Sequence, residues 1–342
     1  MQQEITRPGD LLDARGRLAA SGWAKQLLLS YDRSRVRASP LRIKEWDYYE
    51  IVNPEYGIVL LAYDIGYQGR AIVKWMDFRA GTFEEHGPTI WFPRGAMGLP
   101  PTSEAGDVVF DRGGVHWECR RSTDGLRTFA FSFPEFRGGA GLSGTMSLSQ
   151  PRGQDTMVNA IPFRRATQFV YAQKIACMVP DGVVRIGSDE YRFSHGNHSN
   201  GCLDWSRAVF PYRVEWRWCI ASGTVGGVPF GLNIDYGFGT ESSKSMIFHD
   251  HRGHHLDRPR YAFDAGDPMK DWIFTDEGGR VELTLKPVCI ERGDTNFVLL
   301  RMKLLKAYGF FCGRVRLDDG RLIEVRESDR LFGSAEAVVN RW

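Results

Sequence analysis

The chain has 342 residues, enough for about two domains that each bury an apolar core. Its 44 Lys and Arg residues nearly balance 42 Asp and Glu residues, and a net charge of +2 gives no electrostatic case for a nucleic-acid partner. Glycine (38 residues) and aromatic residues (13%) are both frequent, which is typical of a β-rich protein with many turns.

The first expected element is a short helix over residues 19–29. Beyond it, apolar and polar side chains alternate in residues 128–133, 214–220 and 281–286, as in antiparallel strands. Residues 297–305 are apolar without a regular period and stay ambiguous between helix and strand. Turn signals separate these stretches: Arg112-Gly113-Gly114, Gly187-Ser188-Asp189, Glu277-Gly278-Gly279 and Asp318-Asp319-Gly320. Since strands and helices do not alternate, an all-β fold is predicted and a dinucleotide-binding fold is not.

A change of composition within residues 151–181 divides the chain. There the expected strand Leu142–Ser149 gives way to a stretch rich in Pro, Arg and Gln, and new hairpins begin at Val183. No flexible linker marks the division, so the two halves should pack tightly. The predicted units are an N-terminal arm over 1–39 with the short helix, a first β-barrel-like domain over 40–175 and a second over 176–342.

Membrane and compartment signals are few. No window of about 18 uninterrupted apolar residues occurs, so no integral membrane segment is expected. The first residues lack the basic-then-apolar plan of a secretory signal. The six cysteines are scattered without a C-x-x-C pair, which predicts free thiols in the cytoplasm. A homodimer is compatible with these features.

Several stretches carry a resemblance to known proteins. They are Arg42-Ile43-Lys44-Glu45-Trp46-Asp47-Tyr48-Tyr49, Gly201-Cys202-Leu203-Asp204-Trp205-Ser206-Arg207, Trp216-Arg217-Trp218, residues 223–231 and Leu331-Phe332-Gly333-Ser334-Ala335-Glu336. Through them the chain resembles the DUF2804 proteins, a bacterial family of unknown function, from Ile5 to Trp342.

The order of these motifs is also similar to that of tandem lipocalin-like proteins: carotenoid hydratases, tocopherol-cyclase-like proteins and natural-product cyclases. Those proteins carry E-W-W-Y at the start of one barrel and G-x-x-F-D-x-x-W-G at the start of the other. Here Glu45-Trp46-Asp47-Tyr48 differs at its third place, and residues 203–207 keep the aspartate without the final Trp-Gly. The resemblance implies two tandem lipocalin-like (calycin-type) antiparallel β-barrels or strongly bent sheets packed together, with a ligand cavity at or between them.

Asp204 is the first candidate catalytic residue. It stands between Leu203 and Trp205, and a carboxyl group walled by rings is poorly solvated and can stay protonated near neutral pH. The resemblance implies the same role, because the matching aspartate is the proposed acid of carotenoid hydratases. Arg207 would be its electrostatic partner. Alternatively, Asp204 and Arg207 form a structural pair that closes a loop at a barrel rim.

Glu45 is a further candidate. On an extended segment, Glu45 and Asp47 share one face while Trp46 and Tyr48 share the other. Two carboxylates on one face could do acid–base work or bind a cation, or could pair with arginines such as Arg42.

Aromatic residues near these carboxylates could line a hydrophobic pocket or simply fill a core. The candidates for substrate-binding walls are Trp46, Tyr48, Trp205, Trp216, Trp218 and Tyr236.

Histidines offer a competing hypothesis. Four of them, His249, His251, His254 and His255, lie within seven residues, and neutral imidazoles suit zinc or copper. We expect instead an exposed hairpin tip with its turn at Arg252-Gly253, and no metal site is predicted. The residues His195 and His198 are expected in a flexible loop.

No G-x-S-x-G, H-E-x-x-H or P-loop signature occurs. The leading hypothesis is a hydratase, isomerase or cyclase that needs no cofactor and acts on a hydrophobic, isoprenoid- or polyketide-like small molecule, with Asp204 as proton donor. One alternative is a non-catalytic lipid or small-molecule carrier. Another is a carbohydrate-active β-sandwich enzyme with Glu45 and Asp204 as paired carboxylates across a groove.

Overall fold

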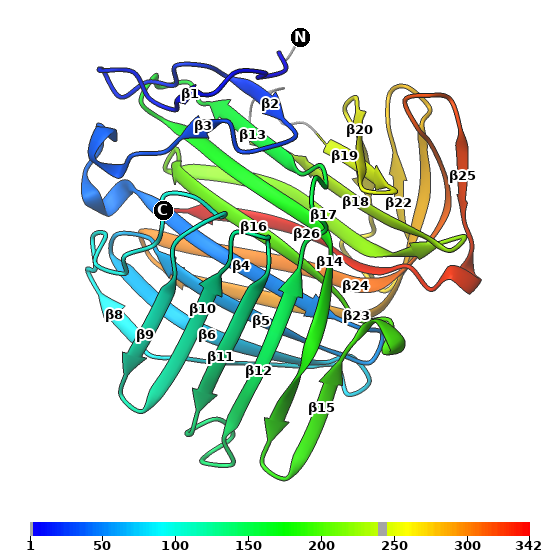
Figure 1. Cartoon of the computed structure of the whole chain (residues 1–342), viewed down its shortest axis with the longest axis horizontal. Coiled ribbons are helices and arrows are strands. Elements are labelled where there is room, and N and C mark those ends of the chain that lie inside the picture. Colours follow the sequence, from blue (N-terminus) through cyan, green and yellow to red (C-terminus); the bar gives the residue numbers. More distant parts are fainter. Residues whose placement is uncertain (1–2, 239–244) are drawn as a thin grey trace.

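A computed structural model describes residues 3–238 and 245–342 of the chain. Two large antiparallel sheets dominate it, and the described residues contain no α-helix (Figure 1). The all-β prediction of two tandem, strongly bent lipocalin-like sheets is therefore confirmed.

The first sheet has 14 strands, all from the N-terminal 209 residues. They are β2 (Gly22–Ala24), β4 (Lys44–Val52), β5 (Tyr56–Asp64), β6 (Gln68–Asp77), β7 (Thr82–His86), β8 (Thr89–Trp91), β9 (Val108–Arg112), β10 (Val115–Arg121), β11 (Arg127–Phe133), β12 (Leu142–Ser149), β13 (Met157–Pro162), β14 (Phe169–Ile186), β15 (Asp189–Phe193) and β16 (Asn200–Val209). The main path runs β7-β6-β5-β4-β16-β14-β12-β11-β10-β9.

The second sheet has 10 strands in the order β20-β19-β18-β17-β26-β24-β23-β22-β21, with β25 beside β24. They are β17 (Arg213–Val225), β18 (Val228–Tyr236), β19 (Ser245–His249), β20 (Arg252–Leu256), β21 (Arg260–Ala262), β22 (Trp272–Thr275), β23 (Val281–Phe297), β24 (Leu300–Arg316), β25 (Leu322–Val325) and β26 (Phe332–Arg341). The remaining elements are the short parallel pair β1 (Gly9–Asp10) and β3 (Leu29–Ser30) and 3-10 turns at Arg33–Arg35, Pro40–Arg42, His195–Asn197 and Glu327–Asp329.

A bend in β14 curls the first sheet. The first part of this strand pairs with β13 and β16, and its last part pairs with β12 and β15. A register shift between Ile175 and Met178 separates the two parts, and Cys177 there has a φ of 56°. A bulge of this kind bends a strand and increases its twist, so the sheet folds back over its own interior.

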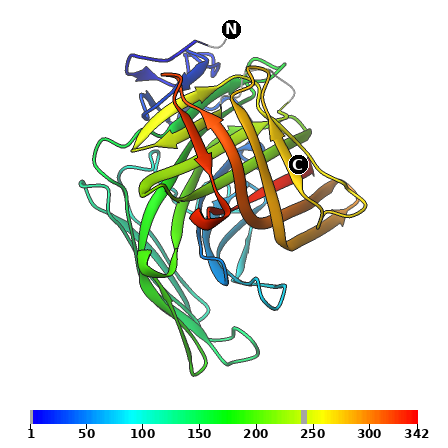
Figure 2. The ribbon, with the colours of Figure 1, turned by 90° about the vertical axis from the view of Figure 1, so that its right-hand side faces the viewer.

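Both sheets are strongly curled (Figure 2). Each encloses its own apolar core, and smaller apolar clusters lie between the two sheets. Trp75, Trp117 and Trp205 belong to the first core. Trp272 and Phe311 belong to the second. The face of the first sheet formed by β4, β16 and β14 lies against β17 and β18 of the second.

Most local predictions agree with these elements. Residues 128–133 lie in β11 and residues 281–286 in β23, and the four predicted turns each join two strands. The ambiguous stretch 297–305 forms the tip of the β23–β24 hairpin and the beginning of β24. All six cysteines are free.

The helix predicted over residues 19–29 is wrong. Residues 22–24 form β2, which pairs with β13, and the Trp23 amide donates to the carbonyl of Gln3. Because pairing with distant strands satisfies the backbone here, tertiary contacts override the local preference for a helix.

The strands of residues 176–209 pair within the first sheet, so the change of sheet comes after Val209. The predicted domain limits at 175/176 were placed from composition alone and stay a prediction. Among the residues that the structure describes, none forms a helix with the length and apolarity of a membrane crossing.

Candidate functional site

The central strand pair β4–β16 carries most of the predicted site residues, on two different faces. In its register Asp204 lies opposite Tyr48, and Arg207 lies opposite Glu45. Since successive side chains of a strand point to opposite faces, Asp204 and Tyr48 face the second sheet. Glu45 and Arg207 face the interior of the first sheet, together with Trp205.

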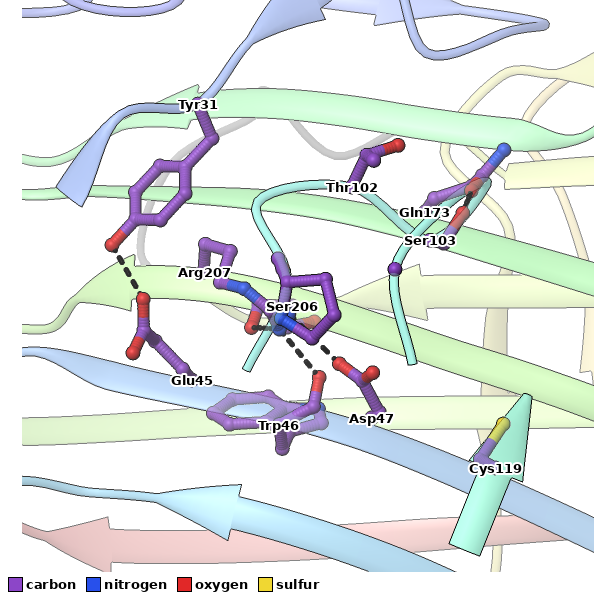
Figure 3. A network of polar contacts seen from close by, with 12 residues as sticks. Tyr31, Glu45, Trp46, Asp47, Thr102, Ser103, Cys119, Gln173, Ser206 and Arg207 are labelled. Carbon is purple, nitrogen blue, oxygen red and sulfur yellow. Dashed lines mark hydrogen bonds and ion pairs between the residues drawn. The ribbon is translucent and has the colours of Figure 1, made fainter. Parts of the chain in front are cut away.

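The inward face holds a network of buried ion pairs (Figure 3). Arg207 donates to Asp47 at 2.9 Å and to the carbonyl of Pro100 at 2.6 Å, and Arg121 pairs with the other oxygen of Asp47. Tyr31 donates to Glu45 at 2.8 Å, and Arg33 pairs with the same carboxylate. Burial raises the pKa of Glu45, and the charge of Arg207 opposes that rise. Each charge of this buried network is therefore paired with one of opposite sign.

The expected pairing of Asp204 with Arg207 does not occur. Residues 201–207 lie in strand β16 instead of a loop, and residues three apart in a strand point to opposite faces. Asp204 pairs instead with Lys174 of β14, at 2.5 Å, and accepts a hydrogen bond from Ser206 at 2.8 Å. Arg207 therefore belongs to a separate network.

Charged and aromatic side chains gather between the two sheets around Asp204. We call them the interface cluster; its members are Tyr48, Glu50, Lys174, Asp204, Trp216, Trp218, Asp235, Lys306 and Glu336. Both sheets contribute to the interface cluster, and most of its members are buried.

Lys306 holds one end of the interface cluster. Its ammonium group lies 2.6 Å from Glu50 and 3.6 Å from Glu336. Tyr48 donates to Glu50 at 2.6 Å, and Trp216 donates to Glu336 at 3.0 Å. Burial by itself would raise the pKa of Glu50, but the charge of Lys306 and these hydrogen bonds lower it overall.

The Trp218 ring links the two lysines. The ammonium nitrogens of Lys174 and Lys306 lie 4.8 Å and 5.2 Å from its ring centroid. The indole nitrogen donates to Asn233 at 3.2 Å, which fixes the ring plane. Two buried ammonium groups thus lie close to one aromatic ring, and each is balanced by a carboxylate, Lys174 by Asp204 and Lys306 by Glu50.

Two carboxyl groups of the interface cluster have raised pKa values. Burial raises the pKa of Asp235 to about 7; the carboxylates of Asp204 and Glu336 add to the rise, and Lys174 opposes it. Burial also raises the pKa of Glu336. An acid whose pKa is near 7 can both give and take a proton at neutral pH. Asp235 is thus the best-tuned acid of the cluster.

The sheets pack closely at this place. A crevice of about 10 Å³, the space of roughly one water molecule, lies between Glu50, Cys202 and Ser222. A much larger groove, of about 1130 Å³, lies within the N-terminal arm and is lined by residues such as Ile5 and Arg37. Neither space is lined by Asp204.

The structure thus divides the predicted residues. It brings together Tyr48, Asp204, Trp216 and Trp218, and it places Glu45, Trp205 and Arg207 on the opposite face of the first sheet. Trp46 stacks on Phe210 in an apolar cluster beside the site. Tyr236 points into the core of the second sheet, where it packs against Tyr261. Glu45 and Asp204 cannot act as a carboxylate pair across one groove.

The histidine-rich hairpin differs from its prediction as well. Its turn lies at Asp250-His251, and its tip packs on other parts of the chain. His255 stacks on Trp23, with ring centroids 5.1 Å apart, and Asp155 accepts from the Gly253 amide at 2.9 Å. Within residues 3–238 and 245–342, no group of three or more ligating side chains could hold a metal ion.

Sequence reasoning missed Lys174, Asp235 and Lys306 as site residues. Each is a charged residue within an apolar strand, as in Gly231-Leu232-Asn233-Ile234-Asp235. Such alternation is typical of a strand with one solvated face, and only the covering sheet shows that this face is buried.

Comparison with known proteins gives a family and a fold. The model of one family, described as "Domain of unknown function (DUF2804)", matches residues 2–342. No curated protein matches.

Three solved structures are similar to this chain. CghA is 11% identical with a TM-score of 0.59, and the match covers 97% of each chain. A protein from Nitrosomonas europaea with a provisional AttH assignment is 14% identical with a TM-score of 0.51, covering 90% of this chain and 96% of that one. Kievitone hydratase from Nectria haematococca is 10% identical, covering 97% and 98%, with a TM-score of 0.46. At these identities the first two show the shared fold.

Proposed function

The chain belongs to the DUF2804 family, and we propose that it is a hydratase, isomerase or cyclase that acts on a hydrophobic small molecule between its two sheets without a cofactor. The observation that carries the proposal is a buried acid, Asp235, whose pKa burial raises to about 7 and which lies near the buried ion pair of Lys174 and Asp204 between the sheets.

The charges of the interface cluster favour one class of substrate. Lys174 and Lys306 would stabilise negative charge that develops on a carbonyl oxygen, as in an enolate. Because each lysine is already paired with a carboxylate, this support comes from ammonium N–H donors to the carbonyl oxygen, an acceptor that an isoprenoid alkene lacks. Of the two expected substrate classes, polyketide-like molecules, which carry carbonyl groups, therefore fit the site better than isoprenoids.

The proposal gives the donor role to Asp235 instead of Asp204. Asp204 is engaged with Lys174 at 2.5 Å, so it serves to hold that ammonium group in place. In an isomerisation, Asp235 would take a proton from the carbon next to the carbonyl and return it to another carbon of the resulting enolate. In a hydration, it would take a proton from the water that adds to an enone and return it to the enolate carbon. Trp216 and Trp218 would contact the apolar body of the substrate.

Binding requires that side chains between the sheets move apart, since the crevice there holds about one water molecule. The aromatic cluster next to the site offers a route, because Trp46 and the C-terminal Trp342 each stack on Phe210, with ring centroids 6.0 Å and 5.6 Å away. An apolar ligand could exchange places with such rings without exposing charge.

The test is turnover of a panel of apolar enones and polyketide-like ketones, followed by mass spectrometry for an added water and by chromatography for isomers. We expect Asp235→Asn to lower the rate about 10²–10⁴-fold with ligand affinity nearly unchanged, because general acid–base catalysis contributes that much. Asp181→Asn, the same change at an exposed position of β14, is the matched control and should keep full rate.

Two outcomes would reject the proposal. Full activity in Asp235→Asn would remove the acid from the mechanism. Binding of panel members without any product, in native mass spectrometry and activity assays alike, would assign the site to a carrier instead.

A further inference from the structure

The β23–β24 hairpin ends in three exposed apolar residues. Phe297, Val298 and Leu299 are 69%, 86% and 69% exposed, and they extend beyond the sheet at the tip of two 17-residue strands. Soluble proteins rarely expose three consecutive large apolar residues, and an exposed apolar patch usually marks a site where another protein or a membrane binds.

Arginines lie next to the tip of this hairpin. Arg213, Arg341 and Arg301 lie side by side in register on the adjacent strands β17, β26 and β24. Arg301 pairs with Asp294 at 2.8 Å, and Arg341 donates to the neutral side chain of Asn296. Like charges directly opposite one another destabilise a sheet, so this arginine row is suited to an external anion.

A second exposed apolar pair lies on the first sheet. Trp91 and Phe92, at the end of β8, are 67% and 57% exposed, and the exposed Arg94 follows them. This arrangement repeats that of the hairpin tip: large apolar side chains next to a cation.

Printed contacts join the two places. The Phe92 amide donates to the carbonyl of Tyr67, and Lys44 lies 4.3 Å from the ring of Tyr67 and 5.1 Å from that of Trp342. Figure 1 shows β8 and the C-terminus at the same edge of the molecule.

From Trp342 the contacts continue to the hairpin. The Trp342 amide donates to the carbonyl of Tyr212 at 2.9 Å, and the Tyr212 hydroxyl donates to the carbonyl of Leu299. Tyr212 is itself exposed. We call the exposed residues that these contacts connect the docking edge; it consists of Trp91, Phe92, Tyr212, Phe297, Val298 and Leu299.

We propose that the docking edge binds the surface of an anionic lipid bilayer. The hairpin tip would enter the boundary between headgroups and acyl chains, Trp91 and Tyr212 would lie at the headgroup level, and the arginine row would contact lipid phosphates. An anionic bilayer has a layer of negative charge directly above an apolar layer. The first would bind the arginine row, and the second would bury the exposed apolar side chains. The inference stands on exposure and charge alone and does not depend on the proposed catalytic activity.

The test is co-sedimentation of the full chain with vesicles of phosphatidylcholine alone or mixed with phosphatidylglycerol. We expect binding to the mixed vesicles that weakens in high salt, because phosphate contacts are screened. Val298→Asp should lower vesicle affinity about tenfold or more, since it replaces a membrane-inserted apolar side chain with a charge. Arg213→Gln combined with Arg341→Gln should lower affinity for the mixed vesicles.

Leu322→Asp is the matched control. Leu322 is an exposed apolar residue of β25, which Figure 1 shows at the opposite edge of the molecule. This variant should bind vesicles like the unaltered chain, and the unfolding curves of all variants should coincide.

Several results would overturn the inference. They are equal binding to neutral and mixed vesicles, no binding to either, an unaffected Val298→Asp, or an equal loss in Leu322→Asp. If Val298→Asp abolishes a concentration-dependent dimer in light scattering while no vesicle binding is seen, the docking edge is an interface between two copies of the chain.

Discussion

Neighbouring residues of β16 perform different tasks because a strand presents its side chains alternately. Trp205 packs in the apolar core inside the first sheet, and Arg207 pairs there with Asp47. Asp204, which precedes Trp205 in the chain, points the other way and pairs with Lys174 in the interface cluster. Both environments are buried, so each charge needs a partner of opposite sign. The consequences of removing a charge therefore differ from one face to the other.

Asp47 should be essential for stability. Its carboxylate is the shared partner of Arg121 and Arg207, whose side chains are almost fully buried. Asp47→Asn would remove the ion-pair partner that the two guanidinium groups share, and breaking a buried pair in this way costs about 3–5 kcal/mol. Urea unfolding measures the loss. The exposed Asp189→Asn should change stability by no more than about 0.5 kcal/mol, and an equally stable Asp47→Asn would contradict the account.

Asp235 should make stability depend on pH. Its pKa is about 7 in the folded chain, above an ordinary value of 3.8, so the folded state binds the proton more tightly. The resulting stabilisation is complete below pH 4 and is lost as the pH rises to about 7, with a slope of up to about 1.4 kcal/mol per pH unit. An amide side chain does not titrate in this range, so Asp235→Asn should lack this component.

The measurement is the difference in unfolding free energy between the unaltered chain and Asp235→Asn from pH 4 to pH 8. The difference should shrink or change sign towards pH 7 and then level off. Asp181→Asn should follow the unaltered chain throughout. Parallel curves for the unaltered chain and Asp235→Asn would show that Asp235 titrates at its ordinary pKa.

At the scale of elements, the contact between β14 and β18 sets the distance between the sheets. Gly231 of β18 faces the bulge of β14, and a Cβ atom there would lie 2.7 Å from the Cys177 sulfur and 3.2 Å from the Ala176 methyl carbon. No side chain fits between them. The bulge that curls the first sheet is thus also a point at which the second sheet approaches closely.

Gly231→Ala should destabilise the protein by about 1–3 kcal/mol, the usual cost of overpacking. The same change at Gly293 is the control, because a Cβ there meets only the Leu304 Cβ at an ordinary 3.7 Å. Chemical unfolding of the two variants tests the difference. If both variants are equally stable, the sheets are able to move apart at no cost.

At the scale of the whole molecule, the two sheets are joined by an interface that resembles a third core. Two apolar clusters adjoin the interface cluster, with Met246 and Phe248 in one and Tyr308 and Phe332 in the other. Separation of the sheets would expose these clusters and leave buried charges such as Lys306 without partners from the other sheet. Each half therefore depends on its neighbour.

We expect a single cooperative unfolding transition for the whole chain. Far-UV circular dichroism, which follows the strands of both sheets, and tryptophan fluorescence, which follows the interface and both cores, should give the same midpoint in urea. Gly231→Ala should shift both probes equally. Two separated transitions, or midpoints that differ between the probes, would show that the halves unfold independently.

Alternation and turn residues determined much of this protein from the sequence alone. The strands at residues 128–133 and 281–286, the four hairpin turns and the all-β class follow from local rules, because side-chain period and glycine turns act over a few residues. The motifs around Glu45 and Asp204 indicated the family and the tandem bent sheets. The helix expected at residues 19–29 failed since its backbone pairs with strands distant in the chain.

Only the tertiary structure decided what each face meets. Alternation assigns Asp204 and Arg207 to opposite faces once the strand is known, yet it cannot say that both faces are covered, or by which residues. The second sheet supplies Lys306, Trp218 and Asp235, which lie far from Asp204 in the chain. A residue's charge state depends on burial and on neighbours in space, and these are fixed when the two sheets close on one another.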